Sequence, residues 1–435
     1  MKKTVSLFWF RRDLRLHDNH GLYEALKDSK AVLPIFIFDP SILDSLPKND
    51  ARVEFIHKQL KTIHTHLKKH GSGLSVYHGT PENVFEQLTN EYEVVSVYYN
   101  RDYEPYARSR DQNISNLLNS KSIRFKSYKD HVIFEQDEIT KDDGLPYKVY
   151  TPFSKKWLAA FSNNLYDPFN SETLLSNTYQ SNSHPWVELK SMNFKPNLVK
   201  IAPYKLETDL IENYEATRNF PSVEGTSKLG PHLRFGTVSV REVVSKAIQH
   251  TNNTFLKELI WREFFMQILW HFPHTVTKSF KPQYDAIQWR NAPEDYKKWC
   301  DGNTGYPLVD AGMRELNQTG FMHNRVRMLV GSFLCKHLLI DWRLGEAYFA
   351  EKLHDFELSS NVSNWQWVAG CGVDAAPYFR IFNPTTQITN FDKEHKYIKK
   401  WVPEYQELTY PKPMVDHKFA RERCLATYKE ALSKN

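Results

Sequence analysis

The segment from residue 355 to residue 387 gathers more side chains suited to chemistry than any other part of the chain. It holds the acidic pair Asp355 and Glu357, then Asn361, then Trp365 and Trp367 among small residues. A buried tryptophan needs an acceptor for its indole N–H, so two of them beside Gly, Ala and Asn indicate a wall against a planar group. A bound aromatic cofactor would suit such a wall. An ordinary buried corner of a helical domain is the alternative interpretation.

A second mixed segment is FLKELIWREFF, at residues 255–265. On a helix, Glu258, Trp261, Arg262 and Phe265 fall at positions i, i+3, i+4 and i+7 and share one face. A core face would be apolar and a solvent face would lack tryptophan, so this mixture favours the wall of a pocket. The alternative is an intrahelical ion pair between Glu258 and Arg262 on a half-buried surface.

Two further segments carry polar groups at comparable spacing. In GFMHNRVRM, Asn324, Arg327 and Met328 share a helical face that could meet an amide edge and an apolar shape, unless the methionine simply packs inward. In EGTSKLGPHLRFG, hydroxyl groups and Gly230 precede a helical pattern, as in turns that hold phosphate, although helix capping alone would explain them. The presence of all four segments in one chain region favours a ligand site.

The elements expected to position these residues are of two kinds. Short apolar runs alternating with helical stretches predict parallel strands covered on both faces, at residues 5–10, 32–38, 74–77, 94–99 and 123–128. The expected fold class is therefore α/β over residues 1–130, a doubly wound, Rossmann-like parallel sheet, although the glycine fingerprint of dinucleotide sites is missing. Residues 131–199, rich in Ser, Asn, Pro and Lys, predict an interdomain connector with little core. Apolar residues three and four apart then predict an all-α domain over residues 200–435.

Composition narrows the class of protein. The chain has 435 residues, enough for two domains. Its four cysteines lack the spacing of a zinc site or a disulfide scaffold, which favours a reducing, cytoplasmic compartment and no metal. No apolar run reaches the length of a signal peptide or a membrane span, so we expect a soluble protein with no membrane partner. A net charge of +6 permits a polyanionic partner without requiring one.

Together these motifs resemble those of the photolyase/cryptochrome flavoproteins, and most closely those of the class I cyclobutane pyrimidine dimer photolyases of bacteria. The resemblance covers nearly the whole chain and rests on FWFRRDLRLHDN, EGTSKLGPHLRFG, ELIWREF, TGYPLVDAGMRELNQTGFMHNRVRM, LIDWRLGEAYF and NWQWVAGCGVDAAPYFRIFNPTTQ. It implies a light-driven lyase that repairs pyrimidine dimers in DNA. Its α/β domain would hold an antenna chromophore, and its helical domain would hold FAD.

The resemblance implies a set of residues around FAD. By motif position these are Tyr214, Thr226, Ser227, Lys228, Leu229, Gly230, Phe255, Glu258, Arg262, Asn324, Arg327, Asp355, Phe356, Glu357 and Asn361. Asn361 would face flavin N5, where an amide can hydrogen-bond the reduced cofactor. Two positions depart from the family pattern: Gly230 stands where serine is frequent, and Phe255 where tryptophan is frequent. A backbone N–H and an aromatic face survive there, so we expect FAD binding to persist.

The resemblance also implies a surface for ultraviolet-damaged DNA, double or single stranded. The lesion and its strand would contact Arg218, Glu258, Trp261, Asn324, Arg325, Met328, Trp367 and Gln387. Glu258 would donate a hydrogen bond to the dimer when protonated, and Trp365, Trp342 and Trp289 would carry charge between the flavin and the surface. In the α/β domain, Glu104 would contact an antenna pigment, methenyltetrahydrofolate or 8-hydroxy-5-deazaflavin. We expect a monomer.

Three other functions fit parts of these patterns. A cryptochrome-type photoreceptor would signal without repair, and only about fifty residues follow FRIFNP, too few for a long disordered tail that binds partners. A (6-4) photolyase would be expected to carry a histidine pair where this chain has His323 followed by Asn324. A plain flavin electron-transfer protein would not need basic residues around the Trp261 and Trp367 clamp.

Overall fold

The computed structural model describes residues 2–161 and 167–433. Contacts between residues divide the chain into two compact units. The α/β unit comprises residues 1–138, 159–203 and 229–249, and the helical unit comprises residues 139–158, 204–228 and 250–435. Each unit is thus assembled from separate stretches of sequence, whereas the predicted domains are continuous. The predicted boundaries therefore do not coincide with the units.

The α/β unit is built on a sheet of five parallel strands in the order β3-β2-β1-β4-β5. The strands span Thr4–Phe10 (β1), Val32–Phe38 (β2), Ser75–His78 (β3), Glu93–Asn100 (β4) and Arg124–Tyr128 (β5). In the central strand, Leu7 lies opposite Leu33 of β2 and Val97 of β4. The predicted doubly wound parallel sheet is confirmed, because every predicted strand forms.

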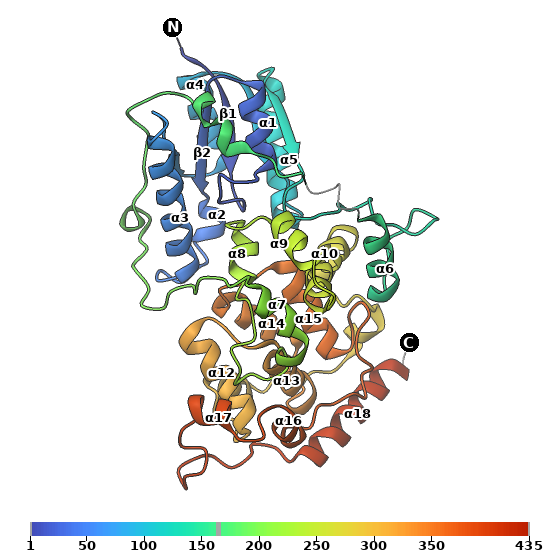
Figure 1. Ribbon diagram of the computed structural model, residues 1–435. Coiled ribbons are helices and arrows are strands. Elements are labelled where there is room, and N and C mark those ends of the chain that lie inside the picture. Colours follow the sequence, from blue (N-terminus) through green and yellow to red (C-terminus); the bar gives the residue numbers. More distant parts are fainter. Residues whose placement is uncertain (1, 162–166, 434–435) are drawn as a thin grey trace. The chain divides into compact units, whose positions relative to one another are not determined.

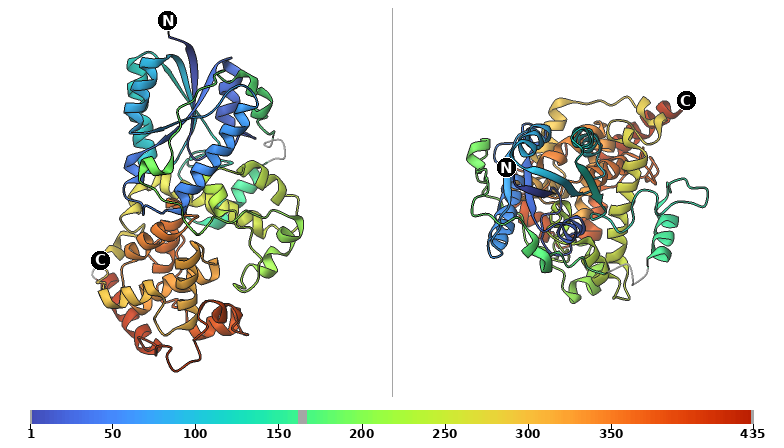
Figure 2. Two further views of the ribbon diagram at one scale, coloured as in Figure 1. Left: turned by 90° about the vertical axis from the view of Figure 1, so that its left-hand side faces the viewer. Right: turned by 90° about the horizontal axis from the view of Figure 1, so that it is seen from above.

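Helices cover both faces of this sheet (Figures 1 and 2). Side chains alternate along β1, so Phe8 and Phe10 share a core cluster with residues of α1 and α3, while Leu7 and Trp9 share one with residues of α4 and α5. These helices span His20–Asp28 (α1), Ala51–Lys68 (α3), Pro81–Glu91 (α4) and Pro105–Ser120 (α5). Shorter elements of the unit are Pro40–Leu43 (α2), Ser171–Asn177 (η2), Leu189–Met192 (η3), Gly230–Phe235 (α8) and Val240–Ala247 (α9).

The segment predicted as a connector with little core is more buried than expected. Leu175, Met192 and Phe194 join the core cluster of α1 and α3, and each is at most 4% exposed. Phe153 and Trp157 of the same segment are 1% exposed and belong to the helical unit. The scattered apolar residues of this polar stretch therefore anchor it to the two units in turn.

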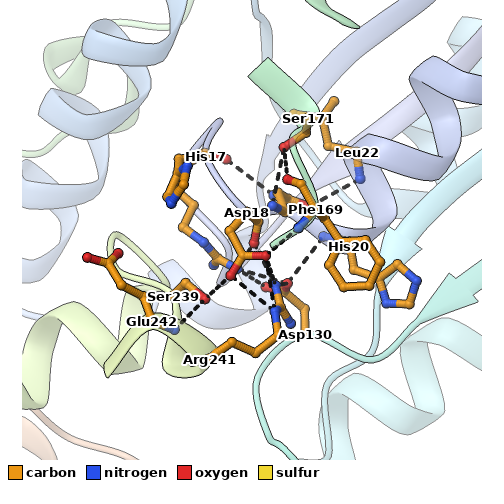
Figure 3. A network of polar contacts seen from close by, with 12 residues as sticks. His17, Asp18, His20, Leu22, Asp130, Phe169, Ser171, Ser239, Arg241 and Glu242 are labelled. Atoms are coloured by element: carbon orange, nitrogen blue, oxygen red, sulfur yellow. Dashed lines mark hydrogen bonds and ion pairs between the residues drawn. The ribbon is translucent and has the colours of Figure 1, made fainter. Parts of the chain in front are cut away.

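A network of buried charges ties the segment after β1 to α9 within the α/β unit (Figure 3). Arg241 donates hydrogen bonds to Asp130 at 2.8 Å and to Asp18 at 3.1 Å, and Arg15 donates to both oxygens of Asp130 at 2.8 Å. The hydroxyl of Ser239 donates to Asp18. Burial raises the pKa of Asp130, but the charges of Arg15 and Arg241 outweigh burial and hold this pKa below its usual range. Every charge in this network is therefore matched inside the fold.

The helical unit is built from helices of varied length. They span Tyr150–Ala160 (α6), Thr208–Thr217 (α7), Thr254–His271 (α10), Pro273–Val276 (η4), Pro282–Ala286 (η5), Pro293–Asp301 (α11), Pro307–Thr319 (α12), Asn324–Ser332 (α13), Phe333–His337 (η6), Trp342–Lys352 (α14), Leu358–Ala369 (α15), Pro384–Phe391 (α16), Lys396–Trp401 (α17) and His417–Ser433 (α18). Proline recurs at helix starts, where its missing N–H costs nothing. All regular elements from residue 254 to residue 433 are helical, which confirms the predicted all-α region.

Candidate functional site

A cavity of about 110 Å³, partly open to solvent, lies among α13, α14, α15 and the segment before α15. Its walls combine two of the motifs singled out in the sequence. The lining residues are Asn324, Arg327, Met328, Gly331, Phe349, Leu353, Asp355, Phe356, Glu357, Ser360, Asn361, Asn364, Trp365, Trp367 and Val368. The predicted shared face of Asn324, Arg327 and Met328 therefore lines the cavity, and Arg325 points elsewhere.

Ion pairs fix the polar groups of the cavity wall. Arg327 donates to both oxygens of Asp355, at 3.2 and 2.9 Å, and its Nε donates to the carbonyl of Met322 at 2.7 Å. Arg262 of α10 donates to Glu357 at 3.0 Å. The expected charge pair between Arg327 and Asp355 is thus present, and both of its side chains remain 18–24% exposed toward solvent.

Asn361 is held by a residue that the sequence reasoning missed. Its Nδ2 donates to the carbonyl oxygen of Glu346 at 3.0 Å and to the carboxyl Oε1 of Glu346 at 2.9 Å. Burial raises the pKa of Glu346, although the hydrogen bond from Asn361 opposes the shift. Glu346 thus engages the Nδ2 of Asn361, and Asn361 also lines the cavity. Glu346 lies in LIDWRLGEAYF. Nothing in that motif predicts its contact with Asn361.

The remaining residues predicted for FAD do not line this cavity. Tyr214 meets Phe255 edge-on at 5.2 Å between ring centroids, and Arg218 lies 5.3 Å from the Tyr214 ring. Lys228 has a left-handed backbone (φ +55°), and its Nζ lies 3.4 Å from the centre of the Phe321 ring. Burial lowers the pKa of Lys228. Thr226 and Ser227 belong with Lys228 to the helical unit, whereas Leu229 and Gly230, at the start of α8, belong to the α/β unit.

The carboxylate of Glu258 is paired with an arginine that the sequence reasoning assigned to DNA. The guanidinium of Arg218 donates to Glu258, and the side chain of Glu258 is 36% exposed. Burial lowers the pKa of Arg218, but the charge of Glu258 and its hydrogen bond, together with Tyr214 and Glu215, raise this pKa above its usual value. A carboxylate in such a pair accepts hydrogen bonds, so a donor role for Glu258 toward a dimer requires this pair to open.

A cluster of arginines lies in the same unit. Arg325 donates to the side-chain oxygen of Asn219 at 2.6 Å and stacks over Phe391 at 4.2 Å. Burial lowers the pKa of Arg325, and the charges of Arg218 and Arg380 lower it further. Arg380, which the sequence reasoning missed, lies 5.9 Å from the Trp367 ring and is exposed. The only local sign of a role for Arg380 is that it is the arginine of the FRIFNP motif. Gln387, on α16, is half-buried.

The predicted charge-hopping residues belong to one hydrophobic cluster of the helical unit. Trp365 and Trp342 are 3% and 1% exposed, and Trp289 packs at the edge of the cluster against Tyr428, with ring centroids 6.1 Å apart. Trp365 also meets Trp299 edge-on, at 6.1 Å. Trp299 was not singled out in the sequence, because it stands outside the Trp-x-Trp pair and its neighbours are ordinary.

Glu104, the residue predicted to contact an antenna pigment, lies at the start of α5 in the α/β unit. Its carboxylate accepts hydrogen bonds from Arg12 at 3.2 Å and from Arg234 at 2.9 Å. Two guanidinium groups therefore already match its charge, and its contact with a pigment stays a prediction.

Metal-binding groups and membrane-spanning helices are two further kinds of feature that the described residues could hold. Among residues 2–161 and 167–433, no group of three or more His, Cys, Asp or Glu side chains is arranged to hold a metal ion. In the same ranges, no helix is long and apolar enough to cross a membrane.

Two family models match the chain. The model described as DNA photolyase matches residues 6–172, and the model described as the FAD binding domain of DNA photolyase matches residues 255–409. Deoxyribodipyrimidine photo-lyase of Agrobacterium fabrum is 36% identical over 98% of this chain and 98% of its own. The corresponding protein of Escherichia coli is 35% identical over 98% of this chain and 99% of its own. The chain therefore belongs to the DNA photolyase family, and it contains that family's FAD-binding domain.

Solved structures agree with this assignment. A bacterial class III photolyase from Agrobacterium tumefaciens superposes with a TM-score of 0.88 at 34% identity, covering 100% of this chain and 99% of that one. A photolyase from Sulfolobus tokodaii, solved with two FAD molecules, superposes with a TM-score of 0.83 at 33% identity. The match covers 98% of this chain and 100% of that one. A Synechocystis cryptochrome superposes with a TM-score of 0.83 at 26% identity, covering 98% of this chain and 99% of that one. Because a class III photolyase and a cryptochrome share the fold, the class I assignment stays a prediction.

Proposed function

We propose that this protein is a deoxyribodipyrimidine photo-lyase, which uses light and bound FAD to split cyclobutane pyrimidine dimers in ultraviolet-damaged DNA. The observation that carries the proposal is the cavity of the helical unit, where Asn361, Trp365 and Trp367 meet Asn324 and Met328. A protein that only passed electrons between partners would need a flavin, but it would not need an arginine cluster around the same aromatic wall.

The residues of the cavity fit a flavin. Arg327 and Asp355 would hold the polar edge of the ring system, and Asn361 would face the N5 side. When bound, FAD supplies the light-absorbing centre that lends one electron to the dimer and receives it back.

The chain's other task is to bind the lesion and orient it. Photolyases are among the enzymes that turn a damaged base out of the duplex, at a cost of a few kcal/mol that is smaller for a poorly stacked lesion. Trp261 and Trp367 would contact the rings of the dimer, and Asn324 and Glu258 would bond its polar edges. Met328 would fill the apolar gap. Arg218, Arg325 and Gln387 would contact the DNA strand, and Arg380 joins them by its position.

The proposal is tested by illuminating the purified protein, with FAD reduced, in the presence of an oligonucleotide that contains a thymine dimer. We expect light-dependent recovery of thymine absorbance and none in the dark. The same oligonucleotide carrying a (6-4) photoproduct serves as the control substrate, and we expect no recovery from it. Failure to repair the dimer with FAD bound and reduced would contradict the proposal.

A photoreceptor without repair activity is the second candidate, because a cryptochrome shares the fold at a TM-score of 0.83. The side chains expected to hold a lesion, Glu258, Asn324, Met328 and Trp367, are all present, which favours repair. Further parts of the proposal are a monomeric state, a cytoplasmic location and an antenna pigment near Glu104. Gel filtration, cell fractionation and the absorbance spectrum of the purified protein test them in turn.

A further inference from the structure

Trp261, one of the two proposed lesion-contacting indoles, has a stacked partner inside the helical unit. The ring of Tyr150 lies parallel to it, with centroids 3.6 Å apart and an interplanar angle of 6°. Tyr150 is the first residue of α6, which runs alongside α10 (Figure 1). Nothing in the sequence between residues 139 and 158 marks Tyr150 as part of a site, because its motif resembles a plain helix start.

Tyr150 is held by two hydrogen bonds, one through its hydroxyl and one through its backbone. Its hydroxyl donates to the carbonyl of Lys257 in α10 at 2.8 Å, and its backbone N–H donates to the carboxylate of Asp374 at 3.1 Å. Tyr150 is 9% exposed, and burial raises the pKa of its hydroxyl, which therefore stays protonated as a donor. Tyr150 is thus fixed to α10 through its hydroxyl and to the segment after α15 through its backbone.

The rest of α6 secures Tyr150 against α10. Trp157 donates its indole N–H to Glu263 at 2.6 Å, and the ring of Phe153 packs against that of Phe264 at 5.2 Å. These contacts lie one and two helical turns from Tyr150, on the same side of α6. They leave the stacked pair little freedom to slide.

The stack decides which face of Trp261 can meet a ligand. Tyr150 covers one face, Phe264 meets the indole edge-on at 5.6 Å, and Phe265 meets it at a tilt at 5.2 Å. Trp261 is nevertheless half-buried and not fully buried, so part of the indole remains accessible to a ring that arrives from solvent. An indole fixed in this way loses its rotational freedom when the protein folds and not when DNA binds, which strengthens binding.

We propose that Tyr150 is a positioning residue of the lesion site, acting through Trp261, and that it sets the plane against which the dimer stacks. This inference rests on the proposed repair function. It assigns no contact between Tyr150 and DNA, so the effect of Tyr150 on binding must depend on the presence of Trp261.

The test measures the dissociation constant of the FAD-loaded protein for a thymine-dimer oligonucleotide and for the same oligonucleotide without the dimer. We expect Tyr150→Leu to weaken binding of the damaged strand about tenfold, the range of a single aromatic stacking contact, and to leave the undamaged strand within about twofold of wild type. Tyr150→Phe keeps the stack and should restore affinity to within about threefold. At saturating DNA, the repair rate per photon should change far less than the affinity, because the flavin site is untouched.

A double-mutant cycle separates action through Trp261 from an independent contact. In a Trp261→Ala background, Tyr150→Leu should cause less than about a twofold further loss. FAD content and far-ultraviolet circular dichroism verify folding of each variant, and Tyr150→Met replaces Tyr150→Leu if the latter does not retain FAD. The inference would be overturned if Tyr150→Leu bound the damaged strand as tightly as wild type. It would also be overturned if the losses of affinity from Tyr150→Leu and Trp261→Ala were additive. If wild-type protein does not prefer the damaged strand, the proposed function itself fails.

Discussion

One set of ion pairs in the α/β unit and one ion pair in the helical unit differ sharply in exposure. In the α/β unit, the carboxylates of Asp18 and Asp130 are 0% exposed, and Arg241 pairs with both while Arg15 pairs with Asp130. In the helical unit, the pair of Arg327 and Asp355 borders a cavity and stays 18–24% exposed. A charge that is fully matched inside the fold holds the chain together, whereas a charge left partly open at a cavity wall is available to a ligand.

The largest effect is expected in the helical unit, on the flow of charge toward the flavin. Trp342→Phe should abolish light-driven reduction of oxidised FAD and leave repair by chemically reduced enzyme nearly intact, because phenylalanine is much harder to oxidise than tryptophan. Absorbance of bound FAD under illumination measures the first property, and dimer repair measures the second.

Trp299→Phe is the matched control for this route, because Trp299 is equally buried and touches Trp365. We expect it to keep photoreduction. If Trp299→Phe blocks photoreduction and Trp342→Phe does not, the charge leaves by Trp299 and the predicted route is wrong.

Breaking the buried network of the α/β unit should cost more stability than any change at the cavity. Asp130→Asn leaves Arg15 and Arg241 without their shared counter-ion, so we expect a loss of about 3–5 kcal/mol in the free energy of unfolding. Urea unfolding followed by circular dichroism measures it.

The control for this prediction is Lys246→Gln, which removes an exposed ion pair with Glu242 on the same helix as Arg241. It should change stability by less than about 0.5 kcal/mol. If both variants lost the same free energy of unfolding, the buried network would contribute no more to stability than an exposed ion pair. That result would contradict the proposed contrast between the two units.

The ion pair of Arg327 and Asp355 at the cavity should affect FAD binding more than stability. Arg327→Met should weaken FAD binding by about 1–3 kcal/mol, the usual value of hydrogen bonds to a charged group, and should lower stability by no more than about 1 kcal/mol in the apoprotein. Equilibrium dialysis with FAD and urea unfolding of the apoprotein measure the two quantities.

Arg343→Met tests whether the position of Arg327 matters, since Arg343 forms a similarly exposed pair with Asp285 away from the cavity. It should leave FAD affinity unchanged. A loss of FAD affinity as large as that of Arg327→Met would mean that the cavity pair has no special role.

The smallest effect is a pH dependence of stability in the helical unit. His337 is fully buried with its Nε2 2.8 Å from Nδ1 of His417, and burial, followed by the charges of His417 and Arg423, lowers its pKa to about 3. The unfolded chain has a histidine pKa near 6.5, so it takes up a proton that the folded chain refuses. This contribution is complete above about pH 6.5 and is lost as the pH falls toward 3.

The measurement compares wild type with His337→Asn by urea unfolding at pH 7.5 and pH 5. Wild type should lose roughly 1–2 kcal/mol more than the variant over this interval, because only one histidine differs between them. Parallel losses would show that His337 is protonated in the folded protein.

Local sequence was sufficient for the elements and for the faces of individual helices. Alternating apolar runs located all five strands, and the spacing of Asn324, Arg327 and Met328 placed them together on the cavity wall. Such patterns work because strand and helix periodicities fix which side chains share a face. The family resemblance then supplied the cofactor and the reaction, which no single motif determined.

The partners of these residues came only from the tertiary structure. Glu346 beneath Asn361, Arg218 beside Glu258 and Tyr150 behind Trp261 lie far away in sequence or on other elements. The chain enters the α/β unit and returns to the helical unit between Arg218 and Glu258 and between Tyr150 and Trp261, and no local pattern of hydropathy encodes that return. Glu346 and Asn361 meet because α14 packs against α15 within the helical unit. The sequence by itself determined which groups are able to do chemistry, and the packing of distant segments decided their orientation, charge and exposure.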